Sequence, residues 1–248
     1  MTHYLDDSEK IRFGDYYMEC VKNANTKLAH IKNDVIKDLQ DVSQKAGQIS
    51  GDFAKRWFEL ADILIIVRHN DDDIGFVVAN FYTNDVVFLV VSMIAHEHQH
   101  KKIGNIINSH VLRYFIYYRL KEISKILSGF YFIFRTQNPI VYYALSKHAE
   151  LYPSLKNNNI PPKEKNIAIN FVKNIWPGSN FDLNRFVIFD AYANAPGLKY
   201  TAATLPKCKD ERINKFMRDN LKFEITNNNA QLILGKISIL KQLYILFS

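Results

Sequence analysis

The chain has 248 residues, 48% of them hydrophobic and 13% aromatic, and a formal net charge of +7. This much apolar material supplies a sizeable core and excludes a disordered chain, and the length suits one domain over residues 1–248. The positive charge favours anionic partners, among them phosphate-bearing cofactors, nucleic acid and acidic surfaces, without choosing between them.

The N-terminus and the cysteines favour a cytoplasmic protein. The first ten residues are polar and acidic, unlike a secretory signal peptide. No run of about 18 apolar residues is free of charge, and the most apolar one, at the C-terminus, contains Lys236 and Lys241. We therefore expect no membrane span. Cys20 and Cys208 form no motif, so neither a disulfide framework nor a zinc site is expected, and a reducing compartment fits them.

The pattern changes from helix to strand near residue 60. Residues 8–48 have apolar side chains at mixed three- and four-residue steps between charges, which indicates mostly helix. β-Branched stretches separated by short polar turns then predict an antiparallel meander of three strands, at residues 63–69, 74–82 and 86–95. Residues 60–150 would form the core of the domain, and residues 1–59 a helical N-terminal part.

The period of the apolar residues changes again after the third strand. One helical face runs from residue 102 to about residue 126. A strand follows at 130–135, and a second helix begins where Asn138 can cap it and Pro139 occupies the first helical position. Since a helical crossover separates them, the fourth strand can lie parallel to the third.

Residues 151–248 are predicted to complete the sheet and to end in helices. Residues 171–176 indicate a short helix, and residues 185–192 and 198–205 indicate strands. The predicted fold class is therefore α/β, with a mixed, mostly antiparallel sheet flanked by helices, an N-terminal helical segment and a C-terminal extension.

The stretch I-A-H-E-H-Q-H-K-K-I-G-N, residues 94–105, joins the third strand to the long helix. If the strand continued through it, His96, His98 and His100 would share one face and could converge on a metal ion. The alternative is a loop leading into a helix, whose first N–H groups and positive dipole end hold an anion. We favour the loop, because the two lysines that follow would repel a cation and no further cluster of metal ligands has suitable spacing. No metal site is expected.

This junction and the β-β-β-α-β-α order resemble the acyl-CoA-binding signature of the GCN5-related N-acetyltransferases (the GNAT superfamily) over roughly residues 60–150. Ile94 takes the place of the valine that ends the strand in that signature, Gln99 that of its glutamine, and Gly104 matches a glycine directly. The resemblance implies that the cofactor, acetyl-CoA, is held by Ile94, His96, Gln99, His100, Lys101, Lys102, Ile103, Gly104, Asn105 and Asn138.

The chain also departs from the superfamily's pattern. His96 stands where proline is usual, and His100 and Lys102 stand where glycine is usual. A side chain at either glycine position would narrow the phosphate cradle or require a negative φ. In the helix after Asn138, Leu145 replaces a frequent catalytic tyrosine, and Tyr142 lies one turn earlier on the same face.

The resemblance implies an N-acyltransferase that moves an acyl group, in the first place acetyl, from coenzyme A to an amine. Tyr142 would protonate the departing thiolate, a task that suits a tyrosine. The expected partners are an amine-bearing small molecule or a protein lysine, and a second copy of the chain in a homodimer.

Two other classes of function stay open. A GNAT-like fold without the usual glycines and tyrosine can bind a ligand or a protein without catalysis. Nucleic-acid binding is suggested by the net charge and by the alternating aromatic and basic residues at 114–119. It is disfavoured because that stretch has a helical period, which core packing and a solvated face explain.

Overall fold

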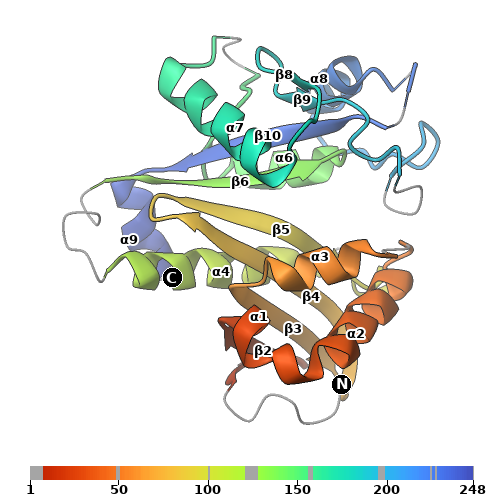
Figure 1. Cartoon of the computed structure of the whole chain (residues 1–248), viewed down its shortest axis with the longest axis vertical. Helices are drawn as coiled ribbons and strands as arrows, with labels where there is room; N and C mark the ends of the chain where they lie inside the picture. Colours follow the sequence, from red (N-terminus) through yellow and green to blue (C-terminus); the bar gives the residue numbers. More distant parts are fainter. Residues whose placement is uncertain are drawn as a thin grey trace. The chain divides into compact units, whose positions relative to one another are not determined.

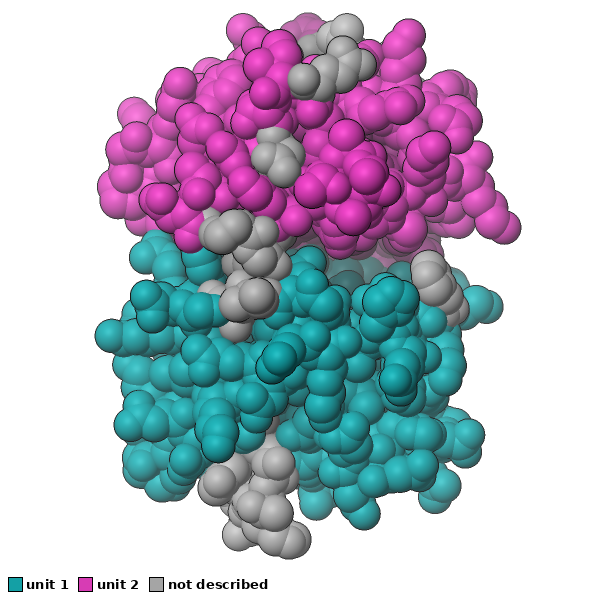
Figure 2. Space-filling view, turned by 90° about the vertical axis from the view of Figure 1, so that its right-hand side faces the viewer, with its two compact units in different colours: residues 1–126, 244–248 teal, residues 127–243 magenta. Residues whose placement is uncertain are grey.

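The computed structural model describes residues 8–48, 51–99, 101–120, 128–155, 159–194, 199–223, 225–226 and 228–247. The chain falls into two compact units, residues 1–126 with 244–248, and residues 127–243 (Figure 2). Each unit has its own strands, helices and buried apolar side chains. A single domain over residues 1–248 stays a prediction.

The first unit contains five strands that pair antiparallel in chain order (Figure 1). They are β1 Glu9–Phe13, β2 Tyr16–Lys22, β3 Ile63–His69, β4 Asp72–Thr83 and β5 Val86–Ile94. The predicted meander of three strands is confirmed as β3, β4 and β5. Every residue from Ile63 to Val67 is buried, so this strand is covered on both of its faces.

The prediction of helix for residues 8–22 is wrong, because they form the hairpin β1–β2. Gly14 and Asp15 make its two-residue connection, and Gly14 has a φ of +60°, the left-handed conformation that such tight turns require. A glycine next to an aspartate between apolar stretches is a hairpin signal that the sequence does contain. The charged residues of β1 obscured its two-residue alternation.

Helices cover both faces of this sheet. They are α1 Ala24–Lys27, α2 Lys32–Lys45, α3 Phe53–Glu59 and α4 Ile103–Arg119, with the 3-10 turns η1 Ala29–Ile31 and η2 His96–His98. In Figure 1, α2 and α3 lie in front of β3–β5 and α4 runs behind these strands. α2 buries Val35, Leu39 and Val42, one stripe of its surface. The helix predicted from residue 102 is confirmed as α4, and its predicted extension over residues 121–126 lies outside the described residues.

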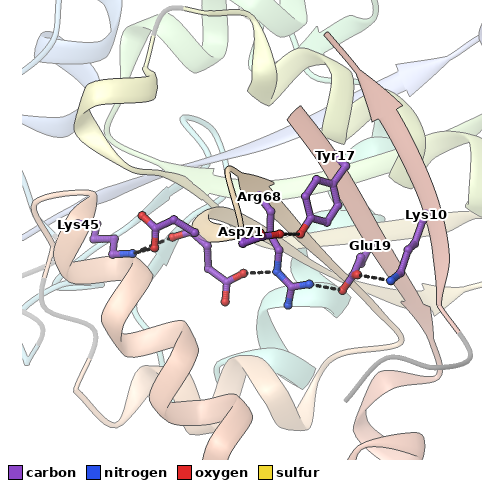
Figure 3. A network of polar contacts seen from close by, with 8 residues as sticks. Lys10, Tyr17, Glu19, Lys45, Arg68 and Asp71 are labelled. Atoms are coloured by element: carbon purple, nitrogen blue, oxygen red, sulfur yellow. Dashed lines mark hydrogen bonds and ion pairs between the residues drawn. The ribbon is translucent and has the colours of Figure 1, made fainter. Parts of the chain in front are cut away.

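A network of charges with a buried arginine at its centre joins β1, β2, β3 and β4 (Figure 3). Arg68 on β3 is 8% exposed, and it donates from Nη1 to Glu19 at 2.8 Å and from Nε to Asp73 at 2.6 Å. Lys10 approaches the other oxygen of Glu19 at 3.2 Å. Burial by itself would lower the pKa of Arg68, but the bond to Asp73 and the two carboxylate charges more than offset it and raise the pKa. The guanidinium therefore stays charged inside the unit.

The second unit contains β6 Phe130–Thr136, β7 Glu150–Tyr152, β8 Phe181–Asp182, β9 Val187–Ile188 and β10 Ala230–Ile237. Its strands lie in the order β6-β10-β9-β8, with β7 also pairing with β10. Its helices are α6 Pro139–Ser146, α7 Pro162–Ile175 and α8 Glu211–Leu221, and α9 Ile239–Phe247 ends the chain. The strand at 130–135 and the helix after Asn138 are confirmed, and the short helix predicted at 171–176 is the end of the longer α7.

Within residues 230–247 the chain is helical only from Ile239, because Ala230–Ile237 forms the strand β10. Gly235 lies opposite Phe132 in the pairing of β10 with β6. A Cβ on Gly235 would come within 2.0 Å of the Phe132 ring. The glycine therefore makes room for a large aromatic side chain across the pair of strands.

Of the strand predicted at 185–192, only the two residues of β9 are extended. The residues that flank it explain this, since Phe186 has a φ of 53° and Asp190 a φ of 52°. Both values lie in the left-handed region, which ends an extended run.

The strand predicted at 198–205 is wrong for residues 199–205, the described part of it. The Thr201 and Thr204 hydroxyls each accept a hydrogen bond from the other residue's N–H, at 3.2 and 2.9 Å. Threonines that bond the nearby backbone in this way favour a turn over a strand.

The predicted fold class, α/β with a mixed, mostly antiparallel sheet flanked by helices, is confirmed. Its N-terminal segment is corrected from a purely helical one to a hairpin followed by helices. Within the part of the chain that the structure describes, no helix has both the length and the apolar character needed to cross a bilayer.

Candidate functional site

The loop predicted to bind an anion connects β5 to α4 in the first unit. The strand ends at Ile94, a single 3-10 turn covers His96–His98, and the helix begins at Ile103. The side-chain amide of Gln99 closes the loop by donating from Nε2 to the Ile94 carbonyl at 3.1 Å. The chain thus leaves the strand after Ile94, as the loop interpretation predicted.

Lys102 occupies the N-cap position of α4 with φ 62° and ψ 6°. Glycine adopts this left-handed conformation freely, whereas other residues do so at a cost of about 1–2 kcal/mol. A lysine where the GNAT signature has glycine therefore does not force a negative φ here. A left-handed residue beside helical ones turns successive N–H groups toward one side, as in anion-binding nests.

Lys102→Gly is expected to raise the free energy of unfolding by up to about 1 kcal/mol, because relief of the left-handed strain exceeds the extra freedom of the unfolded chain. Lys147, at the end of α6, has a φ of −77°, so the control Lys147→Gly should lose about 0.4–1 kcal/mol. Chemical denaturation without ligand measures both variants. A Lys102→Gly variant that loses as much stability as Lys147→Gly would contradict a strained backbone at Lys102.

Gly104, the second residue of α4, is not required by packing. Outside its chain neighbours and the backbone of its own helix, a Cβ built on it meets no atom of the described residues within 4 Å, whereas a Cβ on Gly75 would lie 2.5 Å from Cδ1 of Ile94. Glycine in a helix costs about 0.5–1 kcal/mol relative to alanine. Packing therefore explains Gly75, while Gly104 keeps a space open at the start of the helix at some cost in stability.

The first turn of α4 combines hydrogen-bond donors with positive charge. The N–H groups of Ile103 and Gly104 have no partner within an α-helix, and the helix dipole is positive at this end. The side chains of Lys101 and Lys102 are exposed beside them, as is that of Asn105. This is a chemically suitable cradle for a phosphate group.

A cluster of aromatic and histidine rings contacts the loop between β5 and α4 at His98. The Tyr16 hydroxyl is 3.1 Å from Nδ1 of His98, and the His69 ring lies 4.9 Å from the Tyr16 ring and 5.1 Å from the His98 ring. The Lys101 ammonium lies 6.0 Å from the Tyr16 ring centroid. Sequence reasoning missed Tyr16 and His69, because only the pairing of β2 with β3, which puts them opposite each other, reveals their contact.

His98 is expected to titrate below its ordinary pKa of 6.5, because burial and the charges of Lys101 and His69 disfavour its protonated form. Between its folded pKa and 6.5 the unfolded chain holds more protons, so this group makes stability fall as the pH drops through that window. Lys101→Gln should raise the His98 pKa in an NMR titration. The titration of His110, whose pKa burial and Arg113 lower, should not change. An unchanged His98 pKa would contradict the contact with Lys101.

The other histidines of the stretch give no metal site among the described residues. There, no group of three or more histidine, cysteine, aspartate or glutamate side chains is placed to hold a metal ion. His96 is exposed on the 3-10 turn, and His100 lies outside the described residues. Cofactor binding by His96 and His100 stays a prediction.

In the second unit, Asn138 caps α6 as predicted. Its Oδ1 accepts the Ile140 N–H at 2.9 Å, and its Nδ2 donates to the Tyr200 hydroxyl at 3.4 Å. The Tyr200 N–H in turn donates to Oε1 of the buried Gln137 at 2.9 Å. These bonds fix the turn from β6 into α6. A contact of Asn138 with a cofactor stays a prediction.

Tyr142 on α6 lies in the core of the second unit. It is 2% exposed, its ring packs 5.5 Å from that of Phe216, and its hydroxyl donates to the Pro153 carbonyl at 2.8 Å. Burial raises its pKa to about 12. These are the properties of a structural tyrosine, and its role as a general acid stays a prediction.

Tyr142→Phe is expected to cost about 1 kcal/mol of unfolding free energy, the net value of one hydrogen bond. If the role of Tyr142 is structural alone, any acyl-transfer rate should change no more than in Tyr143→Phe, a variant of the half-exposed neighbour on the same helix. Thermal unfolding and steady-state rates measure the two effects. A general acid contributes about 10²–10⁴-fold, so a loss of that size with little loss of stability would establish the catalytic role.

Solved structures that are similar to this chain include three acetyltransferases. One, described as an IAA acetyltransferase from Bacillus cereus ATCC 14579, is 10% identical with a TM-score of 0.46, over 90% of this chain and 99% of that one. A GNAT family acetyltransferase from Elizabethkingia anophelis with acetyl-CoA bound is 13% identical with a TM-score of 0.40, over 91% and 99%. Tetrahymena GCN5 is 12% identical with a TM-score of 0.42, over 66% and 88%.

No protein-family model and no curated protein matches the chain. One of these structures is described as a GNAT family acetyltransferase, and the TM-scores of all three lie below 0.5. The function proposed below therefore depends on the residues of the chain itself.

Proposed function

We propose that the chain is an acyl-CoA-dependent N-acyltransferase that transfers an acyl group, in the first place acetyl, from acetyl-CoA to an amine. The observation that carries the proposal is the open space at Gly104, beside a left-handed N-cap and two exposed lysines. A glycine that lowers helix stability and satisfies no packing need is explained if a ligand comes close to the backbone there.

The residues from Gln99 to Asn105 would hold the pyrophosphate of coenzyme A. The N–H groups of Ile103 and Gly104 would donate to its oxygens, and the two lysines before them would neutralise its charge. The strand end at Ile94, held by Gln99, would hydrogen-bond the arm that carries the acyl group. When bound, the cofactor supplies an activated thioester.

The acceptor must present a neutral amine, because a protonated amine has no lone pair with which to attack the thioester. A small-molecule amine and a protein lysine both meet this requirement. A cytoplasmic location and a homodimer are further expectations that belong to the same proposal.

Calorimetric titration of the full chain with acetyl-CoA tests the binding step, and thiol release over a panel of amines tests the transfer. We expect saturable binding and release of thiol with at least one amine. Acetyl-pantetheine, which lacks the pyrophosphate, is the matched ligand and should bind at least about tenfold more weakly. Absence of binding at about 1 mM acetyl-CoA would overturn the proposal.

A non-catalytic module of the same fold is the second candidate, and the burial of Tyr142 favours it. Such a module would bind acetyl-CoA at the same loop but release no thiol with any amine. The two candidates therefore share the titration result and differ in the thiol assay.

A further inference from the structure

The second unit contains a cavity of about 210 Å³ between α7 and the strand β8 that follows it. Its apolar walls come from Ile169, Val172 and Trp176 on one side, and from Phe181 and Leu183 on the other. The first three recur at helical spacing, so they belong to one stripe of α7 and of the turn that ends it. This cavity lies wholly within the second unit and shares no residue with the loop before α4.

The aromatic walls of the cavity are held in place from behind. The Trp176 ring packs edge-on against the Phe171 ring, with the two ring centroids 5.4 Å apart. The Arg135 guanidinium lies 4.8 Å from the centroid of the Trp176 ring. The Phe181 ring packs 5.7 Å from the Phe186 ring. Walls that are fixed before a ligand arrives lower the entropy lost on binding.

The charge at the cavity is positive. Among the described residues that line it, Lys173 alone carries a charge, and its side chain is exposed. The acid of β8, Asp182, is bound to Arg185 at 2.7 Å. Burial would raise the pKa of Asp182, but bonds from Arg185 and Asn184 more than offset it and lower the pKa. This carboxylate is therefore already matched by Arg185, and Lys173 remains for an anion.

We propose that this cavity binds a small aromatic carboxylate, with its ring between Trp176 and Phe181 and its carboxylate at the Lys173 ammonium. An apolar cavity of about 150 Å³ holds one benzene ring. A volume of about 210 Å³ adds room for a substituent of a few heavy atoms. Apolar burial and ring contacts would supply most of the affinity, and a charge-assisted hydrogen bond the selectivity for an acid.

NMR titration of the full chain with phenylacetate tests the proposal through the indole N–H signals. The chain has two tryptophans, and Trp57 is buried in the first unit, so its signal is an internal control. We expect the Trp176 signal alone to move and to saturate at millimolar phenylacetate. Neutral phenylacetamide, of the same shape, should bind about 3- to 10-fold more weakly.

Three variants complete the test. Lys173→Met should lower the affinity for phenylacetate to that for phenylacetamide. Lys163→Met, an equal change of charge in the first turn of α7, should leave the affinity for phenylacetate unchanged. Ile169→Trp should fill the cavity and abolish binding without lowering the melting temperature. No saturable shift of Trp176 by about 20 mM phenylacetate would overturn the proposal. Equal binding of the amide, or no effect of Lys173→Met, would overturn it as well.

Discussion

Arg68→Ala is expected to lower the free energy of unfolding by about 3–5 kcal/mol, the usual cost of removing one partner from a buried ion pair. The variant leaves Glu19 and Asp73, which are 2% and 8% exposed, without the guanidinium that pairs with both. An uncompensated buried carboxylate is costly because the protein interior solvates charge poorly. Denaturation in urea at neutral pH, followed by circular dichroism, measures the loss.

Lys10→Ala is the matched control, because Lys10 pairs with the same carboxylate of Glu19 but its side chain is 66% exposed. Exposed pairs contribute at most about 1 kcal/mol, so this variant should stay close to the parent. Replacing Arg68, Glu19 and Asp73 together by apolar residues should recover most of the loss, since no buried charge is then left unpaired and Lys10, which loses its partner, is exposed. Equal losses for Arg68→Ala and Lys10→Ala would contradict a special role of the buried pair.

The strands that the sequence predicts correctly are those whose local pattern is sufficient. β3, β4 and β5 are runs of β-branched residues bounded by polar turns. The sequence pattern could not distinguish β10 from the helix α9 that follows it in the chain, because both segments are apolar and both contain a lysine. What makes β10 a strand is its pairing with β6, where Leu234 lies opposite Ile133, about a hundred positions earlier in the chain. Such long-range pairing leaves little local trace.

In the candidate site, too, the features with a local sequence pattern could be predicted, and those that depend on long-range contacts could not. A glycine and two lysines at a strand-to-helix junction are visible in the sequence, and they identify the loop. The left-handed backbone of Lys102 is not visible, since lysine has no preference for it. The contact of Tyr16 with His98 depends on a hairpin that was predicted as helix. The burial of Tyr142 depends on α6 packing against α8, through Phe216.

Gly104→Val is expected to lower the affinity for acetyl-CoA by about 100-fold or more, corresponding to about 2.7 kcal/mol, without destabilising the fold. Any side chain at this position enters the space in which the proposed phosphate would contact the first turn of α4. The fold itself tolerates the change, because no described atom outside the chain neighbours and the backbone of α4 lies within 4 Å of the new Cβ. In addition, valine replaces a glycine that weakens the helix. Calorimetric titration and thermal unfolding of the same preparation measure both quantities.

Two further variants test whether Gly104 is there for a ligand or has no function. Gly104→Ala should raise stability by about 0.5–1 kcal/mol while weakening acetyl-CoA binding less than valine does. Ser109→Val, an exposed position farther along α4, should leave binding unchanged. If Gly104 were kept for packing, stability would fall with side-chain size, and binding would fall only as a consequence. Binding that falls while stability is kept or rises can come only from a ligand at the start of α4, and unchanged binding in Gly104→Val would remove the cofactor from this loop.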